Sequence, residues 1–146
     1  MKVIPISRLS IVLAFLLLPA IQVMAQQENT SIETIFPKGE KLENDHFNSP
    51  VWVNSLITAD SANQNAVGNV IFEPGVRSDW HIHPAGQILL ATGSVGYYQE
   101  KGSPKKILRK GDIVKCPPNV PHWHGASPDQ EFVQIAITGR QHGPTE

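Results

Sequence analysis

The stretch "WHIHPAGQ", residues 80–87, places two histidines two residues apart, just before a Pro-Ala-Gly turn and a glutamine. A second stretch, "PHWHG" at residues 121–125, repeats the His-x-His spacing. The chain has 6 histidines in 146 residues, and most of them fall in these two short stretches. Because side chains alternate across a β-strand, residues i and i+2 point to the same face. Each pair is therefore expected to project two imidazoles together, and imidazole is the commonest protein ligand for transition metals.

The two stretches predict a site for a divalent transition metal. His81 and His83 come from one predicted strand and His122 from a second, and together they supply half of an octahedral shell. Gln87 follows the turn after His83, where its amide oxygen is placed to return to the same centre. Pro84 restricts His83 to an extended conformation, which helps to fix the direction of that ligand.

The other reactive side chains are given structural roles. His46 and His142 lie in polar segments near the two ends, and we expect them to be ordinary surface residues. Cys116 is the only cysteine, so it can form no disulfide within the chain, and we predict a buried apolar role for it. Tyr97 and Tyr98 fall on opposite faces of one predicted strand, so one of the two is expected to reach the metal site with its hydroxyl.

Short β-rich runs dominate the chain from residue 51 onward, most of them bounded by Gly, Pro, Asn or Asp. This pattern is typical of an all-β sandwich or barrel, and we predict one small barrel. No stretch carries a convincing helical period. The predicted strands are residues 51–58, 66–73, 78–83, 87–93, 94–100, 112–117 and 131–138.

The first residues have the layout of a secretory signal peptide. Lys2 and Arg8 provide a basic start, residues 11–18 are almost continuously apolar, and Ala25 ends a small-residue cleavage site. The apolar run is shorter than the ~20 residues that span a bilayer. We therefore predict cleavage after Ala25, export to the periplasm, and no membrane association of the processed chain.

The remaining chain divides into a polar lead and edge segment (26–50), the barrel (51–140) and a tail (141–146). The formal net charge is −1, and no basic run or face stands out, so nucleic-acid partners are not expected. Small barrels expose a sheet edge, which the polar lead of a second copy could cover. We therefore predict a homodimer or a higher homo-oligomer, with a small molecule as the substrate.

The spacing of these residues resembles the cupin superfamily. Its first motif is matched by Gly75, His81, His83 and Gln87, and its second by Gly111, Pro117 and His122. The resemblance implies an all-β, double-stranded β-helix (jelly-roll) barrel with the metal inside. It also implies that the ligand positions are those of His81, His83, Gln87 and His122.

Gln87 departs from the cupin pattern, which usually has a glutamate at this position. Three neutral imidazoles and a neutral amide would leave the dipositive charge of the metal uncompensated. Such a site is a stronger Lewis acid and supports a trivalent metal less well. This favours polarising a substrate oxygen over oxidase or dioxygenase chemistry.

"WHIHPAGQ" together with "HWHGASP" (122–128) is also similar to a narrower group, the manganese-dependent hydroxynitrile lyases among small, carboxymuconolactone-decarboxylase-associated bacterial cupins. The resemblance implies manganese as the metal, with iron, zinc, nickel or cobalt as alternatives. It also places His124 in the pocket, either as a general base or acid or as a pocket wall. Some relatives carry a further histidine where this chain has Gln134, a departure that concerns the cyanohydrin activity and leaves the metal site intact.

The leading prediction is therefore an exported, metal-dependent lyase that acts on a small hydroxy or carbonyl compound. Two alternatives stay open: a non-catalytic cupin that binds a small molecule, and an iron or copper dioxygenase. Metal content separates the dioxygenase from the other two. Loss of activity with retained metal, on replacement of His124, separates the lyase from the binding protein.

Overall fold

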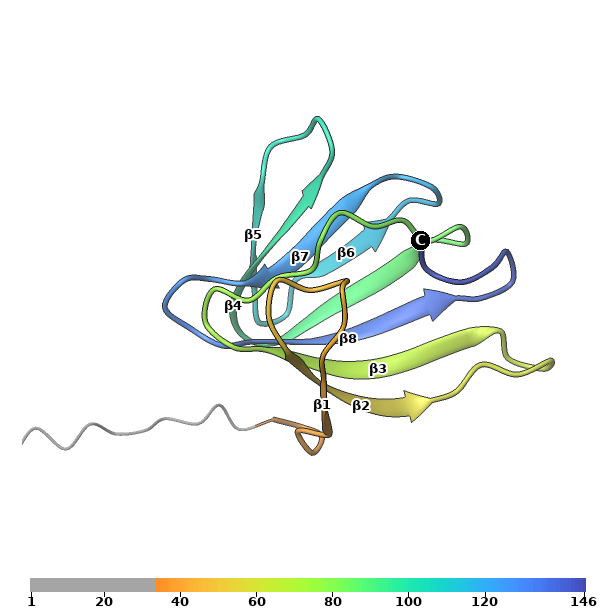
Figure 1. Ribbon diagram of the computed structural model, residues 1–146, viewed down its shortest axis with the longest axis horizontal. Helices are drawn as coiled ribbons and strands as arrows, with labels where there is room; N and C mark the ends of the chain where they lie inside the picture. The colour runs from red at the N-terminus through yellow and green to blue at the C-terminus, as the bar shows by residue number, and fades with distance from the viewer. Residues whose placement is uncertain (1–33) are drawn as a thin grey trace, which may run out of the picture. The chain divides into compact units, whose positions relative to one another are not determined.

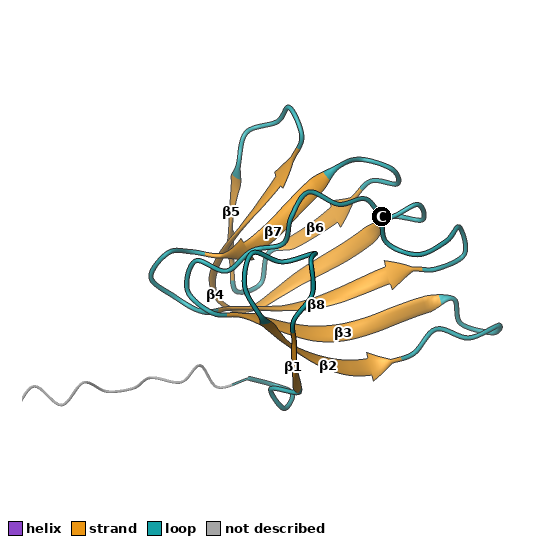
Figure 2. Ribbon diagram, in the orientation of Figure 1, coloured by secondary structure: helices purple, strands orange, loops and turns teal. Residues whose placement is uncertain are grey.

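The computed structural model describes residues 34–146, which consist of strands and loops without a helix (Figure 2). The predicted signal peptide lies outside the described residues. Within residues 34–146, no helix could serve as a membrane span. The strands of this part of the chain are β1 (Glu40–Leu42), β2 (Val51–Ile57), β3 (Asn65–Phe72), β4 (Gln87–Glu100), β5 (Lys106–Arg109), β6 (Ile113–Cys116), β7 (His122–Ala126) and β8 (Phe132–Gly139).

The strands pair in the order β1-β2-β3-β8-β4-β5, and both β6 and β7 also pair with β4. Every one of these pairings is antiparallel. The first part of β4 pairs with β6 and the second part with β5 and β7, so β4 passes from one wall of the barrel into the other. Figure 1 shows β2, β3 and β8 on one side of the fold and β6 and β7 on the other. The predicted all-β barrel is confirmed.

Two of the predicted strands, 87–93 and 94–100, are a single strand of 14 residues, β4. The register against β8 shifts between Ala91 and Gly93, and Ser94 has a φ of 57°. Such a bulge bends a strand and increases its twist while the ladder continues on both sides. The Gly-Ser pair, which looked like the boundary of two strands in the sequence, is therefore the bend at which β4 changes walls.

The predicted strand at 78–83 is a loop in the structure. It contacts β7 without a continuous ladder, through isolated bridges between Arg77 and Gly125 and between His81 and His122, and through hydrogen bonds between Ser78 and His124. Trp80, between these contacts, is 46% exposed. The segment does not form a strand, although its residues favour one, because it contacts β7 at separate points and not through a continuous ladder.

The hydrophobic core lies between the two walls and continues up to the histidine pairs. Phe72 and Phe132 stack with their ring centroids 6.4 Å apart, and both side chains are fully buried. The edge of Phe72 also meets the ring of His124, with the centroids 5.6 Å apart. The ring of His124 therefore packs directly against the hydrophobic core.

Gly96 packs directly against a core side chain. A methyl group there would lie 2.4 Å from Cγ of Phe132, so the ring or β4 would have to shift. Overpacking of this kind costs about 1–3 kcal/mol, and we expect Gly96→Ala to lower the free energy of unfolding by that amount in urea titrations. Gly68→Ala is the matched control, because the nearest atom to its added methyl is Asn54 O at 3.8 Å. Equal losses in the two variants would contradict this description of the core.

Candidate metal centre

A reciprocal backbone contact between His81 and His122 helps to bring the two histidine pairs together. His81 and His83 lie in the connection between β3 and β4, and His122 and His124 lie in β7. The N–H of His81 donates to the carbonyl of His122, and the N–H of His122 donates back, each over 3.0 Å. This reciprocal pair of hydrogen bonds places the loop directly beside β7, so that imidazoles from both segments enter the same space.

Three of the imidazoles form a compact cluster that could hold a metal ion. The ligand atoms of His81, His83 and His122 all lie within 4.8 Å of one another. The three residues are 9%, 4% and 0% exposed, respectively. The rings of His81 and His122 are nearest, with centroids 4.5 Å apart. The structure therefore brings these three predicted residues together in a group that could hold a metal ion.

The backbone turns two of the three rings so that Nε2 faces the cluster. Nδ1 of His81 lies 2.9 Å from the carbonyl of Asp79, and Nδ1 of His122 lies 2.8 Å from the carbonyl of Val120. A carbonyl only accepts, so in each neutral ring Nδ1 carries the proton and Nε2 keeps its lone pair. A hydrogen bond from the other ring nitrogen is the usual arrangement behind a metal-binding histidine.

Buried nitrogen atoms without partners provide the test of whether a metal fits. Nε2 of His83 and Nε2 of His122 are both buried and have no hydrogen-bond partner within residues 34–146. Leaving such a group unsatisfied costs about 1–3 kcal/mol, and a cation among the lone pairs would offset that cost. The donor set of neutral imidazoles suits a transition metal. The residues therefore fit the group that the sequence predicts.

Burial keeps these imidazoles neutral. Desolvation lowers the pKa of His81 to about 4, although the hydrogen bond to Asp79 opposes the shift. Desolvation, helped by repulsion from the neighbouring imidazoles, lowers the pKa of His83 to about 3, and burial also lowers the pKa of His122. Protons therefore compete little with a metal for these lone pairs at neutral pH.

The metal-free protein should lose stability as the pH falls from about 6.5 towards 4. In this window the unfolded histidines bind protons, because their ordinary pKa is about 6.5, whereas folded His81 and His83 stay neutral down to about 4 and 3. The unfolded state binds more protons, so acid favours unfolding. Urea titrations of chelator-treated protein at several pH values measure this slope. His83→Gln should reduce the dependence of the unfolding free energy on pH, and His142→Gln should leave it unchanged. An unchanged dependence in His83→Gln would contradict the lowered pKa of His83.

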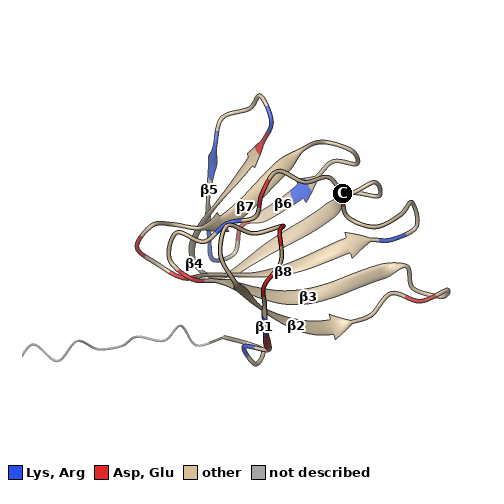
Figure 3. Cartoon of the chain, viewed as in Figure 1, with Lys and Arg blue, Asp and Glu red and all other residues tan. Residues whose placement is uncertain are grey.

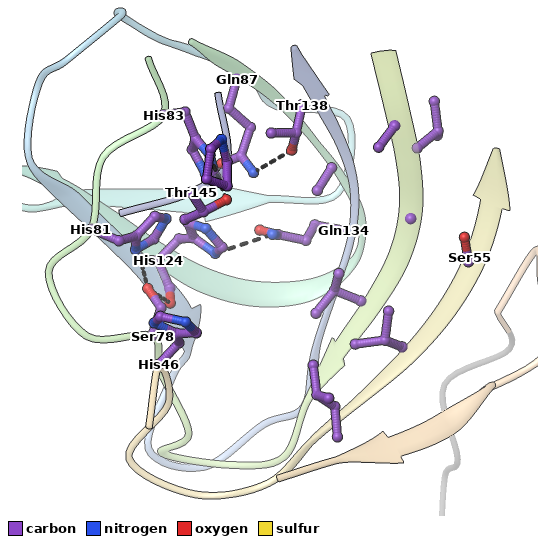
Figure 4. A pocket seen from close by; sticks show the side chains of 18 of the residues that line it. His46, Ser55, Ser78, His81, His83, Gln87, His124, Gln134, Thr138 and Thr145 are labelled. Carbon is purple, nitrogen blue, oxygen red and sulfur yellow. Dashed lines mark hydrogen bonds between the residues drawn. The ribbon is translucent and has the colours of Figure 1, made fainter. Parts of the chain in front are cut away.

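Gln87 starts β4 beside His83 (Figure 4). Its amide N–H donates to the hydroxyl of Thr138 over 2.9 Å, and the residue is 7% exposed. The amide oxygen has only a long contact with Cys116 Sγ, at 4.0 Å. The amide also interacts with the His83 ring, and this contact partly offsets the lowered pKa of His83. The structure therefore places Gln87 next to the cluster, with its oxygen largely free.

His124 lies in the same cavity and outside the cluster of three. Nδ1 of His124 is 3.1 Å from Nε2 of Gln134, and an amide can hold either tautomer of an imidazole, by donating or by accepting. Its own Nε2 is buried without a partner. Burial, together with the three neighbouring imidazoles, lowers the pKa of His124 well below its usual range. The ring is 5.3 Å from that of His81, centroid to centroid.

These side chains form the polar wall of a cavity of about 470 Å³ (Figure 4). The opposite wall belongs to β2, β3 and β8 and is mainly apolar. Polar lining residues include His81, His83, Gln87, His124, Gln134 and Thr138, and apolar ones include Phe47, Val53, Ile57, Val67, Val70 and Ala136. The cavity suits a small molecule with one polar end and an apolar body.

One expectation for residues around the site needs correction and one needs an addition. His46 is exposed, as expected, but it also lines the cavity, and its carbonyl accepts a hydrogen bond from the N–H of Asp79 over 2.8 Å. Tyr98 does point inward, but its ring lies behind His122 and its hydroxyl donates to Glu100 over 3.0 Å. No signal in the sequence located His46, because its position depends on how the β1–β2 connection folds over the loop.

Cys116 has the predicted structural role. It is 1% exposed, and desolvation raises the pKa of its thiol to about 12. The thiol therefore stays protonated at neutral pH and is a poor nucleophile and a poor ligand.

Fold and site together define a small β-barrel with a histidine centre that could hold a metal ion. Residues 68–138 match the Cupin domain family. The (R)-mandelonitrile lyase of Granulicella tundricola is 37% identical over 99 residues, which cover 68% of this chain and 76% of that protein. The chain therefore belongs to the cupin family, as its two motifs predicted.

Solved structures agree with this assignment. A cupin-like protein from Thermotoga maritima is 50% identical with a TM-score of 0.74, over 78% of this chain and 87% of that one. A predicted oxalate decarboxylase, also from Thermotoga maritima, has a TM-score of 0.62 at 15% identity, over 68% of this chain and 90% of that one. At that identity, the second likeness concerns the fold alone.

Proposed function

We propose that this cupin is a metal-dependent lyase that acts on a small hydroxy or carbonyl compound, with α-hydroxynitriles as the first candidates. The observation that carries the proposal is the three-histidine cluster, of which His81 and His83 line the cavity. His124 lines the same cavity and lies outside the cluster. The likeness to a mandelonitrile lyase over most of both chains supports the same reaction class.

The metal would be held by His81, His83 and His122 through Nε2 and by Gln87 through its amide oxygen. We propose a divalent ion, manganese first, with iron, zinc, nickel and cobalt as alternatives. When bound, it supplies Lewis acidity that lowers the pKa of a substrate hydroxyl. All four protein ligands are neutral, so none of them reduces that acidity by its own charge.

His124 is the group proposed to move the proton. Its Nε2 would take the hydroxyl proton of the substrate, the carbon–carbon bond to the nitrile would break, and the electron pair would leave with cyanide. The hydroxyl carbon becomes a carbonyl, and His124 returns the proton to give hydrogen cyanide. The amide of Gln134 lies 3.1 Å from Nδ1 of His124. For Nε2 to take the proton, Nδ1–H must donate to the amide oxygen of Gln134, so the proposal requires the amide orientation in which that oxygen faces the ring.

The apolar wall would bind the body of the substrate. Val53, Val70 and Ala136 line the cavity opposite the imidazoles. Charged side chains are scattered over the described chain and gather on no single face, which agrees with a small neutral ligand rather than a nucleic acid (Figure 3).

Release of benzaldehyde from mandelonitrile by manganese-loaded protein is the direct assay of the proposed function. Binding without turnover would favour a non-catalytic cupin, and metal-dependent oxygen consumption would favour a dioxygenase.

Gln87→Glu should separate metal binding from Lewis acidity. The added carboxylate should hold the ion at least as tightly, because it brings a negative charge to the centre. The same charge should make the ion a weaker Lewis acid, so we expect metal content to stay level or rise while lyase turnover falls. Metal analysis and the mandelonitrile assay on one preparation measure both. Gln99→Glu, on the same strand outside the cavity lining, is the control; higher turnover in Gln87→Glu would contradict the neutral-ligand argument.

Export and assembly complete the proposal. The layout of residues 1–25 supports export to the periplasm, and intact mass should then show a mature chain that begins at Gln26. The short edge strand β1, with all of its residues exposed, supports a homodimer or higher homo-oligomer. Light scattering at micromolar concentration tests this, and a monomer mass would reject it.

A further inference from the structure

Residues 143–146, which we call the strap, fold back over the loop that carries His81 and His83. The N–H of Ile82 donates to the carbonyl of Glu146 over 2.8 Å, and the N–H of Glu146 donates to the carbonyl of Ile82 over 3.1 Å. Gly143, with a φ of 118°, permits the turn that sends the chain back. Figure 1 shows this dark-blue segment after β8 returning to the green connection before β4. The sequence had indicated only a polar tail here.

The strap also enters the cavity. Pro144 and Thr145 are among its lining residues, and Figure 4 shows Thr145 beside His83. The hydroxyl oxygen of Thr145 lies 3.1 Å from Nδ1 of His83. A side chain 62 positions away in the sequence therefore meets the ring of one member of the cluster.

Thr145 gives Nδ1 of His83 a hydrogen-bond partner that the loop itself does not provide. His81 and His122 are each oriented by the backbone carbonyl two residues earlier, so their direction is fixed within their own segments. Pro84 and the turn that follows direct the His83 carbonyl to the N–H of Gly86, and the Nδ1 of His83 is paired with the strap instead. With Thr145 as acceptor, Nδ1 of His83 carries the proton and the lone pair of Nε2 is left for the cluster.

We infer that the strap is part of the metal centre and that Thr145 is a positioning residue for His83. In this inference the Thr145 hydroxyl accepts from Nδ1–H of His83 and holds the ring, while the backbone pairing with Ile82 holds the strap in place. The inference depends on the cluster binding a metal, as proposed above, and is independent of lyase chemistry. It makes metal affinity depend on a segment outside both sequence motifs.

Thr145→Val and Thr145→Ser form a matched pair for the test. Valine keeps the shape of threonine and removes the hydroxyl, whereas serine keeps the hydroxyl and removes the methyl group. Loss of an outer partner of a metal-binding histidine typically weakens metal affinity about 10–100-fold, and we expect a loss of this size for Thr145→Val. Thr145→Ser should stay close to the wild type. Competition of Mn²⁺ and Zn²⁺ against a chromophoric chelator gives the dissociation constants.

Nitrogen NMR of the metal-free protein provides a second readout that needs neither metal nor activity. The His83 ring should be held with its proton on Nδ1 in the wild type and in Thr145→Ser, and should exchange between tautomers in Thr145→Val. Unchanged tautomer and unchanged metal affinity in Thr145→Val would overturn the inference while leaving the metal centre intact. Wild-type protein that binds neither ion would overturn the metal centre itself, and the inference with it.

Discussion

His122→Ala should leave the purified protein essentially without metal. His122 is fully buried, its ring is fixed by the carbonyl of Val120 at 2.8 Å, and its Nε2 has no partner in the described part of the chain. Its removal reduces the cluster to two imidazoles and takes away the ligand that β7 contributes. The affinity loss should exceed the roughly 10–100-fold that the loss of an outer partner causes. Elemental analysis should show metal falling from near one equivalent per chain to background.

The fold should survive this substitution. The contact that joins the loop to β7 runs between the main chains of His81 and His122, so alanine can still make both hydrogen bonds. His142→Ala is the matched control, because His142 lies outside the cluster of three. Circular dichroism and a thermal melt of the metal-free variant confirm that the barrel persists. Near-stoichiometric metal in folded His122→Ala, as in the control, would show that the metal binds elsewhere.

Much of the fold could be predicted because strand propensity and turn residues are local. The runs at 51–58, 66–73 and 131–138 correspond closely to β2, β3 and β8. The errors arise where tertiary contacts override local signals. Residues 78–83 carry β-favouring side chains, yet the barrel anchors this segment at isolated bridges. The Gly-Ser step inside β4 looks like a turn in the sequence, and only the pairing with β8 shows that it is a bulge.

The cluster itself was predictable, although the reasoning about His81 and His83 was only partly sound. Strand alternation was expected to direct the two rings together, whereas they share a loop held by the bridge to His122. Spacing identified the residues because two pairs among few histidines are informative whatever the local backbone. Thr145 carried no such signal, since its place beside His83 depends on the backbone pairing between Ile82 and Glu146, which no local pattern encodes.

His124→Ala should keep the metal and lose turnover, in contrast to His122→Ala. The ring centroids of the two residues are 6.2 Å apart, and His124 stands outside the group whose ligand atoms converge. Removing a general acid or base typically costs about 100- to 10,000-fold in rate, so we expect the kcat for mandelonitrile to fall by that range. Metal content, measured on the same preparation, should stay near that of the wild type.

A variant of Gln134 tests whether His124 transfers a proton or only packs in the wall of the cavity. Gln134→Leu removes the amide that lies 3.1 Å from Nδ1 and leaves the imidazole in place, so turnover should fall by less than in His124→Ala. A structural role predicts instead that both variants alter KM and stability with little change in kcat. If His124→Ala loses metal as completely as His122→Ala, the two members of the "HWH" pair are equivalent ligands. The division of roles, in which one histidine holds the ion and its neighbour moves the proton, would then be wrong.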